Sequence, residues 1–127
     1  MQIYPSGTEV KTRIGRFTVK VPMYQYSIVV EIGDVQELAK RWTADEIGRC
    51  YGVVIETGQD CSPVVIFSTD ATAAVVAHEC LHLTHKIFRH IGYTPSIEED
   101  EPHAYLLSYL FEQIWSRIEK KQIGYNR

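Results

Sequence analysis

The chain has 127 residues, the length of one ordinary domain, and its 45% hydrophobic residues are enough to build a core. Its net charge of −3 lacks the basic excess that drives binding to phosphate backbones, so no nucleic acid is expected as a partner. No run of about 18 apolar residues is present to span a membrane, and the three cysteines cannot all pair, which favours reduced thiols in a cytoplasmic protein.

Strand patterns come first along the chain. Residues 17–21 (FTVKV) alternate apolar with polar side chains, and residues 27–32 (SIVVEI) are rich in β-branched side chains, so both segments are expected to be strands. Asp34 then has the chemistry of a helix N-cap, and residues 35–42 show helical spacing. The sequence therefore predicts two strands followed by a short helix.

Two further strands and a long helix follow. Residues 51–55 (YGVVI) and 64–67 (VVIF) are apolar runs separated by turn residues, and they are expected to be neighbouring strands. The side chains of residues 68–70 offer oxygen acceptors to free backbone N–H groups, and a helical pattern runs over residues 71–90. Gly92 is expected to end this helix.

A second long helix is predicted over residues 98–121. It opens on the acidic run 98–101, where negative charge is favoured, and Pro102 lies in the first turn, where a missing N–H is tolerated. The elements together predict an α+β fold, with a small twisted mixed β-sheet packed on the two long helices. One domain is expected to cover residues 1–127.

The first long helix carries the motif HECLH, with chemistry typical of a metal site. His78 and His82 lie about 40° apart around a helix and one turn apart along it, so both imidazoles can reach one ion. Glu79 lies about 100° from His78, where its carboxylate can meet a water on the metal without displacing it. Zinc lowers the pKa of such a water to about 7, and Glu79 is the expected general base.

The other faces of this helix are expected to pack. Ala74, Ala77, Leu81 and Phe88 form an apolar stripe that is predicted to lie on the sheet beside the histidine face. Cys80 lies on the side opposite the histidines, and we expect it to be a small packing residue and not a ligand.

A catalytic zinc site has three protein ligands and one open position, so a third donor is needed. Glu101 and His103 on the second long helix are the candidates, and only one can face the metal because they point about 200° apart. Helical periodicity slightly favours His103. His85 shares the face of His78 and His82, but it lies about 10 Å along the axis from His78, too far for one coordination sphere.

The motif HExxH at residues 78–82, followed by ExxAY at residues 101–105, resembles the gluzincin branch of the zincin metallopeptidases. Within that branch the chain is most similar to compact proteins with an ExxA-type third-ligand motif. These include the ImmA/IrrE-like group and small zincin-like proteins encoded by bacteriophages. The resemblance covers residues 64–118. It implies a minimal zincin-like domain and a zinc metallopeptidase acting on a peptide or protein substrate.

The resemblance also implies site residues. It favours Glu101 over His103, so that Zn²⁺ would have the ligands His78, His82 and Glu101. Tyr105 lies one turn after Glu101, where its phenol can donate to an oxyanion or can serve as a packing aromatic. Residues 64–67 would be the sheet-edge strand along which an extended substrate lies.

Two other hypotheses stay open at this stage. The chain is very short for a peptidase, which motivates a non-catalytic zincin-like binding module, possibly phage-encoded, that docks to a host or regulatory protein. The other hypothesis is a metal-free α/β domain whose histidines coincide by chance.

Overall fold

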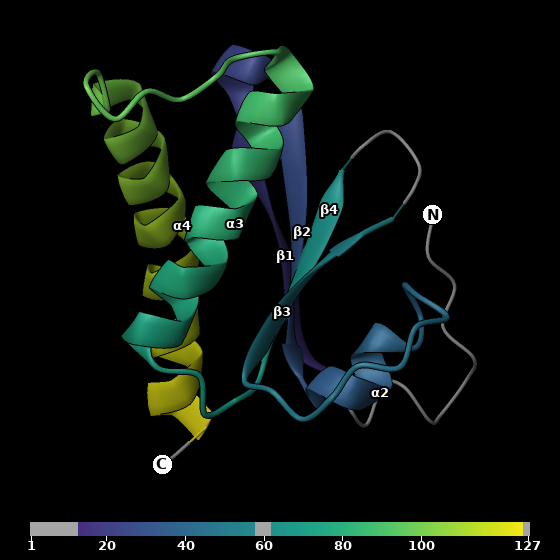
Figure 1. Ribbon diagram of the computed structural model, residues 1–127. Helices are drawn as coiled ribbons and strands as arrows, with labels where there is room; N and C mark the ends of the chain where they lie inside the picture. The colour runs from purple at the N-terminus through teal and green to yellow at the C-terminus, as the bar shows by residue number, and fades with distance from the viewer. Residues whose placement is uncertain (1–12, 58–61, 126–127) are drawn as a thin grey trace.

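The structure is a computed structural model that describes residues 13–57 and 62–125 (Figure 1). Its elements in chain order are β1 (Arg13–Val21), the 3-10 helix η1 (Pro22–Tyr24), β2 (Tyr26–Gly33), α2 (Val35–Ala39), β3 (Gly52–Glu56), β4 (Pro63–Phe67), α3 (Ala73–Ile91) and α4 (Glu101–Tyr125). The predicted strands and long helices are all present in the described residues, and the α+β class is confirmed.

The sheet is mixed, with the strand order β1-β2-β4-β3. Strands β1 and β2 are antiparallel and joined by η1, β2 and β4 are parallel, and β3 is antiparallel to β4. The prediction that residues 64–67 form the sheet edge is therefore wrong, because β4 is paired on both sides. All five residues of β4 are buried, as is typical of a strand covered on both faces, and the edge beside it is β3.

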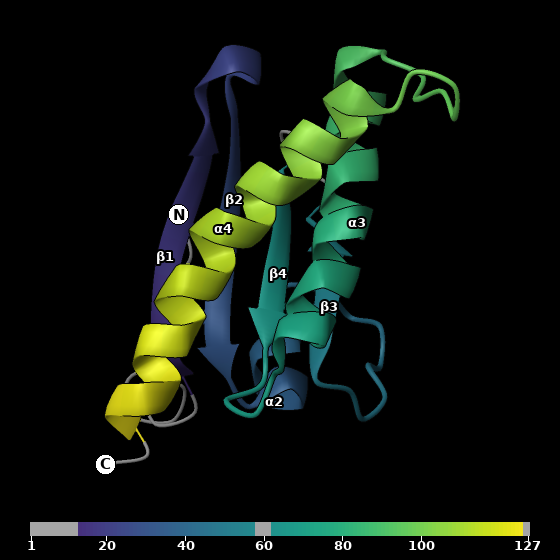
Figure 2. The ribbon, with the colours of Figure 1, turned by 90° about the vertical axis from the view of Figure 1, so that its left-hand side faces the viewer.

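Both long helices cover one face of the sheet, with α4 crossing β1 and β2 and α3 lying over β4 and β3 (Figure 2). The prediction that an apolar stripe packs α3 on the sheet is wrong in part. Of its four residues Phe88 is buried, whereas Ala74, Ala77 and Leu81 are not. The side of α3 that packs into the core lies about a quarter turn further round and comprises Val76, Cys80, Leu83, Ile87 and Phe88. No helix in the described segments is both long and apolar enough to cross a membrane.

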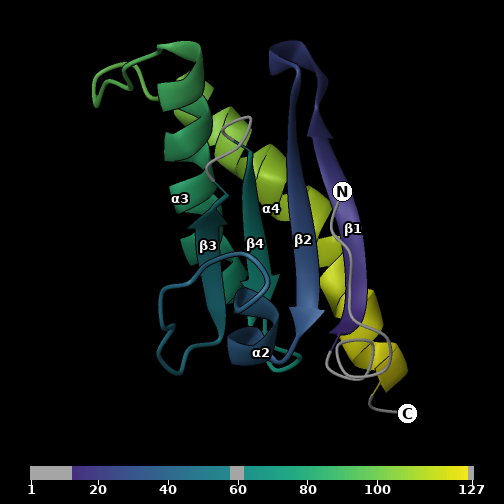
Figure 3. The same ribbon diagram turned by 90° about the vertical axis from the view of Figure 1, so that its right-hand side faces the viewer.

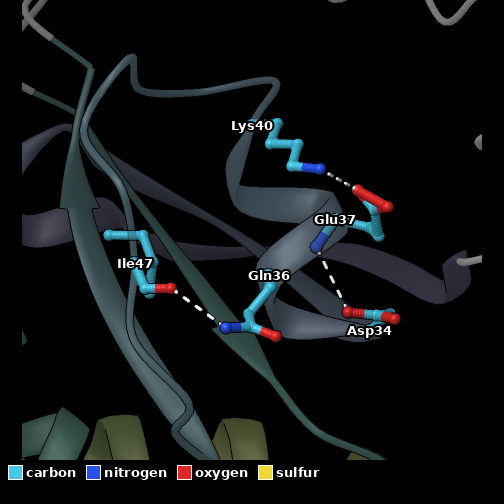
Figure 4. A network of polar contacts seen from close by, with 5 residues as sticks. All are labelled: Asp34, Gln36, Glu37, Lys40 and Ile47. Carbon is cyan, nitrogen blue, oxygen red and sulfur yellow. Dashed lines mark hydrogen bonds and ion pairs between the residues drawn. The ribbon is translucent and has the colours of Figure 1, made fainter.

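The opposite face of the sheet is covered near one end by α2 (Figure 3). The Asp34 cap is confirmed, because the Glu37 N–H donates to Asp34 Oδ1 at 3.2 Å (Figure 4). The helix is shorter than predicted and ends at Ala39. Trp42, expected within it, donates from Nε1 to the buried carboxylate of Glu31 at 2.8 Å, which draws the chain back onto the sheet.

Capping residues define both ends of α3. The N-cap is Thr72, whose Oγ1 accepts from the Val75 N–H at 3.3 Å, so the helix begins slightly later than predicted. Gly92 ends it as expected, in the left-handed region at φ 77°. Its N–H donates to the Arg89 carbonyl at 3.2 Å, and the chain then turns toward α4.

We predict that Gly92→Ala destabilises the protein by about 1 kcal/mol, because an L side chain is strained at this positive φ. A Cβ at this position would meet nothing within 4 Å, so the loss is a backbone effect alone. Gly92→Asn is the control and should lose less, since Asn tolerates the left-handed region. Urea unfolding of the three proteins measures this order, and equal stability of Gly92→Ala and wild type would contradict the assignment.

Candidate metal centre

Helix α3 presents two convergent imidazoles on its outer face. The Nε2 atoms of His78 and His82 lie 3.3 Å apart, and their ring centroids are 5.0 Å apart. A tetrahedral zinc ion bound at its usual distance to two imidazoles separates their nitrogens by about 3.3–3.4 Å. The His78 side chain is 68% exposed, so an ion from solvent can reach the pair. The two donors fit a zinc ion without rearrangement.

Glu79 lies beside the pair in a different environment. Its side chain is only 9% exposed, and its Oε2 lies 4.0 Å from His78 Nε2. Burial raises the pKa of the Glu79 carboxyl above its ordinary value, and the adjacent His78 and His82 partly oppose this rise. A carboxylate with a raised pKa accepts a proton more readily near neutral pH, which suits a general base.

Gly52 is a positioning residue that the sequence analysis did not single out. A Cβ there would lie 3.0 Å from Val75 Cγ1, 3.1 Å from Phe67 Cδ1 and 3.2 Å from Glu79 Cγ. Glycine at the first position of β3 therefore lets α3 come this close, since a larger residue would push its neighbours back by a few tenths of an ångström. A glycine inside a strand pattern often marks such a close approach, and that signal was present in YGVVI.

A second contact ties α3 to the same strand. The Lys86 ammonium pairs with the Glu56 carboxylate at the far end of β3, and this hydrogen bond lowers the pKa of Glu56. Lys86 on α3 and Glu56 on β3 thus join the helix to the strand. The site is thus held against β3, which is an edge of the sheet within the described residues, with Gly52 at one end of the strand and Glu56 at the other.

The packing role predicted for Cys80 is confirmed. Its side chain is fully buried in the core, and burial raises its pKa to about 12. A thiol with such a pKa stays protonated and does not bind metal. Cys50 lies just before β3 and is half-buried, with a pKa also raised by burial.

The structure does not bring Glu101 to the pair. The His103 ring packs at 5.1 Å from His85 and 5.9 Å from Phe88, so the start of α4 lies beside the second half of α3. Glu101 is exposed and lies about 10 Å further along the helix axes than the middle of the histidine pair. Within residues 13–57 and 62–125, no three His, Cys, Asp or Glu side chains gather as a metal-binding group.

The reason is the register between the two helices. The start of α4 lies beside the second half of α3, past the histidine pair along the helix axis. Further along α4, Ser108, Glu112 and Ser116 line a hollow with Ala77. The Glu112 carboxylate does not complete a three-residue metal group with the histidines in the part of the chain that the structure describes.

The remaining candidates lie elsewhere. His103 is half-buried against His85 and Phe88, in the packing role that was the alternative to metal binding. Tyr105 is 70% exposed and lines a hollow with Met23, on the side of α4 away from α3. The proposed oxyanion donor is thus not brought to the histidine pair.

Comparison with known proteins adds no assignment, because no protein-family model, curated protein or solved structure matches the chain. The function proposed below therefore depends on the geometry of residues 78–82 on α3.

We predict that Gly52→Ala destabilises the protein by about 1–3 kcal/mol, because a new methyl group must displace the packed side chains of Val75 and Glu79. Gly48→Ala is the matched control, since a Cβ at Gly48 meets nothing within 4 Å. Chemical unfolding of both variants measures the difference. Equal stability of the two would show that helix and strand do not need this close approach.

Proposed function

We propose that the protein is a zinc-dependent hydrolase of peptide bonds, in which His78 and His82 hold Zn²⁺ and Glu79 is the general base. The observation that carries this proposal is the 3.3 Å separation of the two Nε2 atoms beside a buried carboxylate. Glu79 as a whole is only 7% exposed, and its Oε2 lies 4.0 Å from His78 Nε2. Keeping a carboxyl group buried costs free energy, which supports a functional role for it.

Glu79 has the chemistry that the reaction needs. Bound zinc would act as a Lewis acid on the scissile carbonyl and on a water molecule. Glu79 accepts a proton from the attacking water while the water oxygen forms its bond to the carbonyl carbon. The same carboxyl then donates that proton to the leaving amine as the C–N bond breaks. The raised pKa of Glu79 supports both transfers.

The edge strand β3 is the proposed substrate platform. Its outer edge has no strand partner among the described residues, and Glu79 contacts its first residue, Gly52. An extended peptide that pairs with β3 would run past Glu79 with its carbonyl groups in line. This arrangement favours an unfolded or loop segment as substrate, since a folded helix offers no free backbone groups to an edge strand.

A second candidate is a non-catalytic module that binds another protein. It is favoured by the exposed apolar hollow around Tyr105, which lies on the far side of α4 from the histidine pair. In that case the metal would serve structure or docking. Cleavage of peptides distinguishes the two candidates.

We predict that His78→Ala abolishes stoichiometric zinc, whereas Glu79→Gln retains it and lowers peptide cleavage at least about 100-fold, as expected for loss of a general base. Zinc content by atomic absorption and turnover of a fluorogenic peptide library measure the two effects. His90→Ala, on the same helix beside Tyr26, is the control and should retain both.

Three results would contradict the proposal in different ways. Zinc that survives in His78→Ala would place the site elsewhere. Full activity of Glu79→Gln would exclude its role as base. Bound zinc in the wild type with no cleavage of any peptide would favour the binding module.

A further inference from the structure

One end of the molecule, formed by η1 and the start of α4, exposes apolar side chains. Met23 is 82% exposed and Tyr105 is 70% exposed, although both are large. They border a hollow of about 610 Å³. We call this the Tyr105 surface, and its principal residues are Pro22, Met23, Tyr24, Pro102, Tyr105 and Tyr109. Tyrosine and methionine are the residue types enriched where proteins bind one another.

The hollow is held in shape by its own contacts. Tyr109 donates its hydroxyl proton to the Lys20 carbonyl at 2.7 Å, which ties α4 to the end of β1. On the opposite wall, the Gln25 N–H donates to the Pro22 carbonyl at 3.1 Å and closes the turn of η1. Gln25 itself lies in the left-handed region at φ 51°, an unfavourable conformation for a residue other than glycine. The backbone of both walls is thus fixed by hydrogen bonds, which lowers the ordering cost of binding there.

An acidic run precedes the Pro102 end of the Tyr105 surface along the chain, and the exposed Lys20 precedes its Val21 end. Residues 98–101 are four consecutive acidic side chains, all exposed, and they directly precede Pro102 in the hollow wall. Negative charge beside an apolar hollow favours a partner that carries positive charge next to an apolar side chain. A second copy of this chain is disfavoured, because a two-fold contact through this surface would bring two acidic runs together.

We propose that the Tyr105 surface docks a segment of another protein that inserts an aromatic or long aliphatic side chain into the hollow and flanks it with Lys or Arg. The hollow can hold one or two such side chains. This docking is independent of the histidine pair, because α4 lies between the two sites. Leu107 and Phe111 line a different hollow with Ala77 on the α3 side, while Tyr105 and Tyr109 line this one.

A random peptide display library panned on the wild-type protein tests the proposal. The expected result is enrichment of peptides with one aromatic or long aliphatic residue flanked by Lys or Arg. Met23→Asp and Tyr105→Asp should each weaken the best peptide at least tenfold in isothermal titration, and both sites are exposed enough to leave the fold intact. His78→Ala should bind the peptide as wild type does, which keeps this test separate from the proposed hydrolysis.

Reversing the charge of the acidic run tests whether this run selects basic residues in the partner. The triple variant Glu98→Lys, Glu99→Lys and Asp100→Lys should keep the apolar anchor but select acidic flanking residues. Asp45→Lys with Glu46→Lys reverses exposed charge in the chain segment after α2 and is the control that should leave the selection unchanged.

Three outcomes would overturn the docking proposal. The first is a wild-type selection that enriches no peptide, or only acidic ones. The second is an enriched peptide that binds Tyr105→Asp as tightly as wild type. The third is concentration-dependent dimerisation that Tyr105→Asp abolishes, since the surface would then belong to a second copy.

Discussion

The close approach of α3 to the edge strand β3 is the constraint on which the candidate site depends. Gly52 has no side chain, and a methyl group there would lie 3.0 Å from Val75 Cγ1 and 3.2 Å from Glu79 Cγ, closer than nearly all real contacts. The helix is therefore held beside a strand whose outer edge pairs with no other described strand, and the Lys86–Glu56 ion pair holds it again at the other end. A more distant helix would leave Glu79 in solvent, without the raised pKa that burial produces.

Consecutive residues of one motif have different environments because each helical residue turns by about 100°. His78 has a side chain that is 68% exposed, whereas that of Glu79 is 9% exposed and Cys80 is fully buried. An ion from solvent can therefore reach His78. Glu79 is shielded from water where α3 contacts β3, and Cys80 packs in the core. One regular helix thus carries the proposed metal ligands, the proposed base and a core residue within three consecutive positions and the next turn.

Helix α4 lies between two surfaces of the molecule. One side of it packs near α3, where Leu107 and Phe111 line a hollow with Ala77. Its other side, with Tyr105 and Tyr109, faces η1 and forms an apolar hollow. The proposed hydrolytic centre and the proposed docking surface lie on opposite sides of this helix, so each can be altered by mutation without the other.

Sequence patterns determined the elements, the outward face shared by His78 and His82, and the burial of Cys80, because these follow from local periodicity. Tertiary structure alone decided that β4 is central, since strand order depends on pairing between distant segments. It also decided the register of α4 against α3, which leaves Glu101 about two turns beyond the pair. Periodicity gives the face of a helix but not its axial position, because core packing between the two helices determines that position.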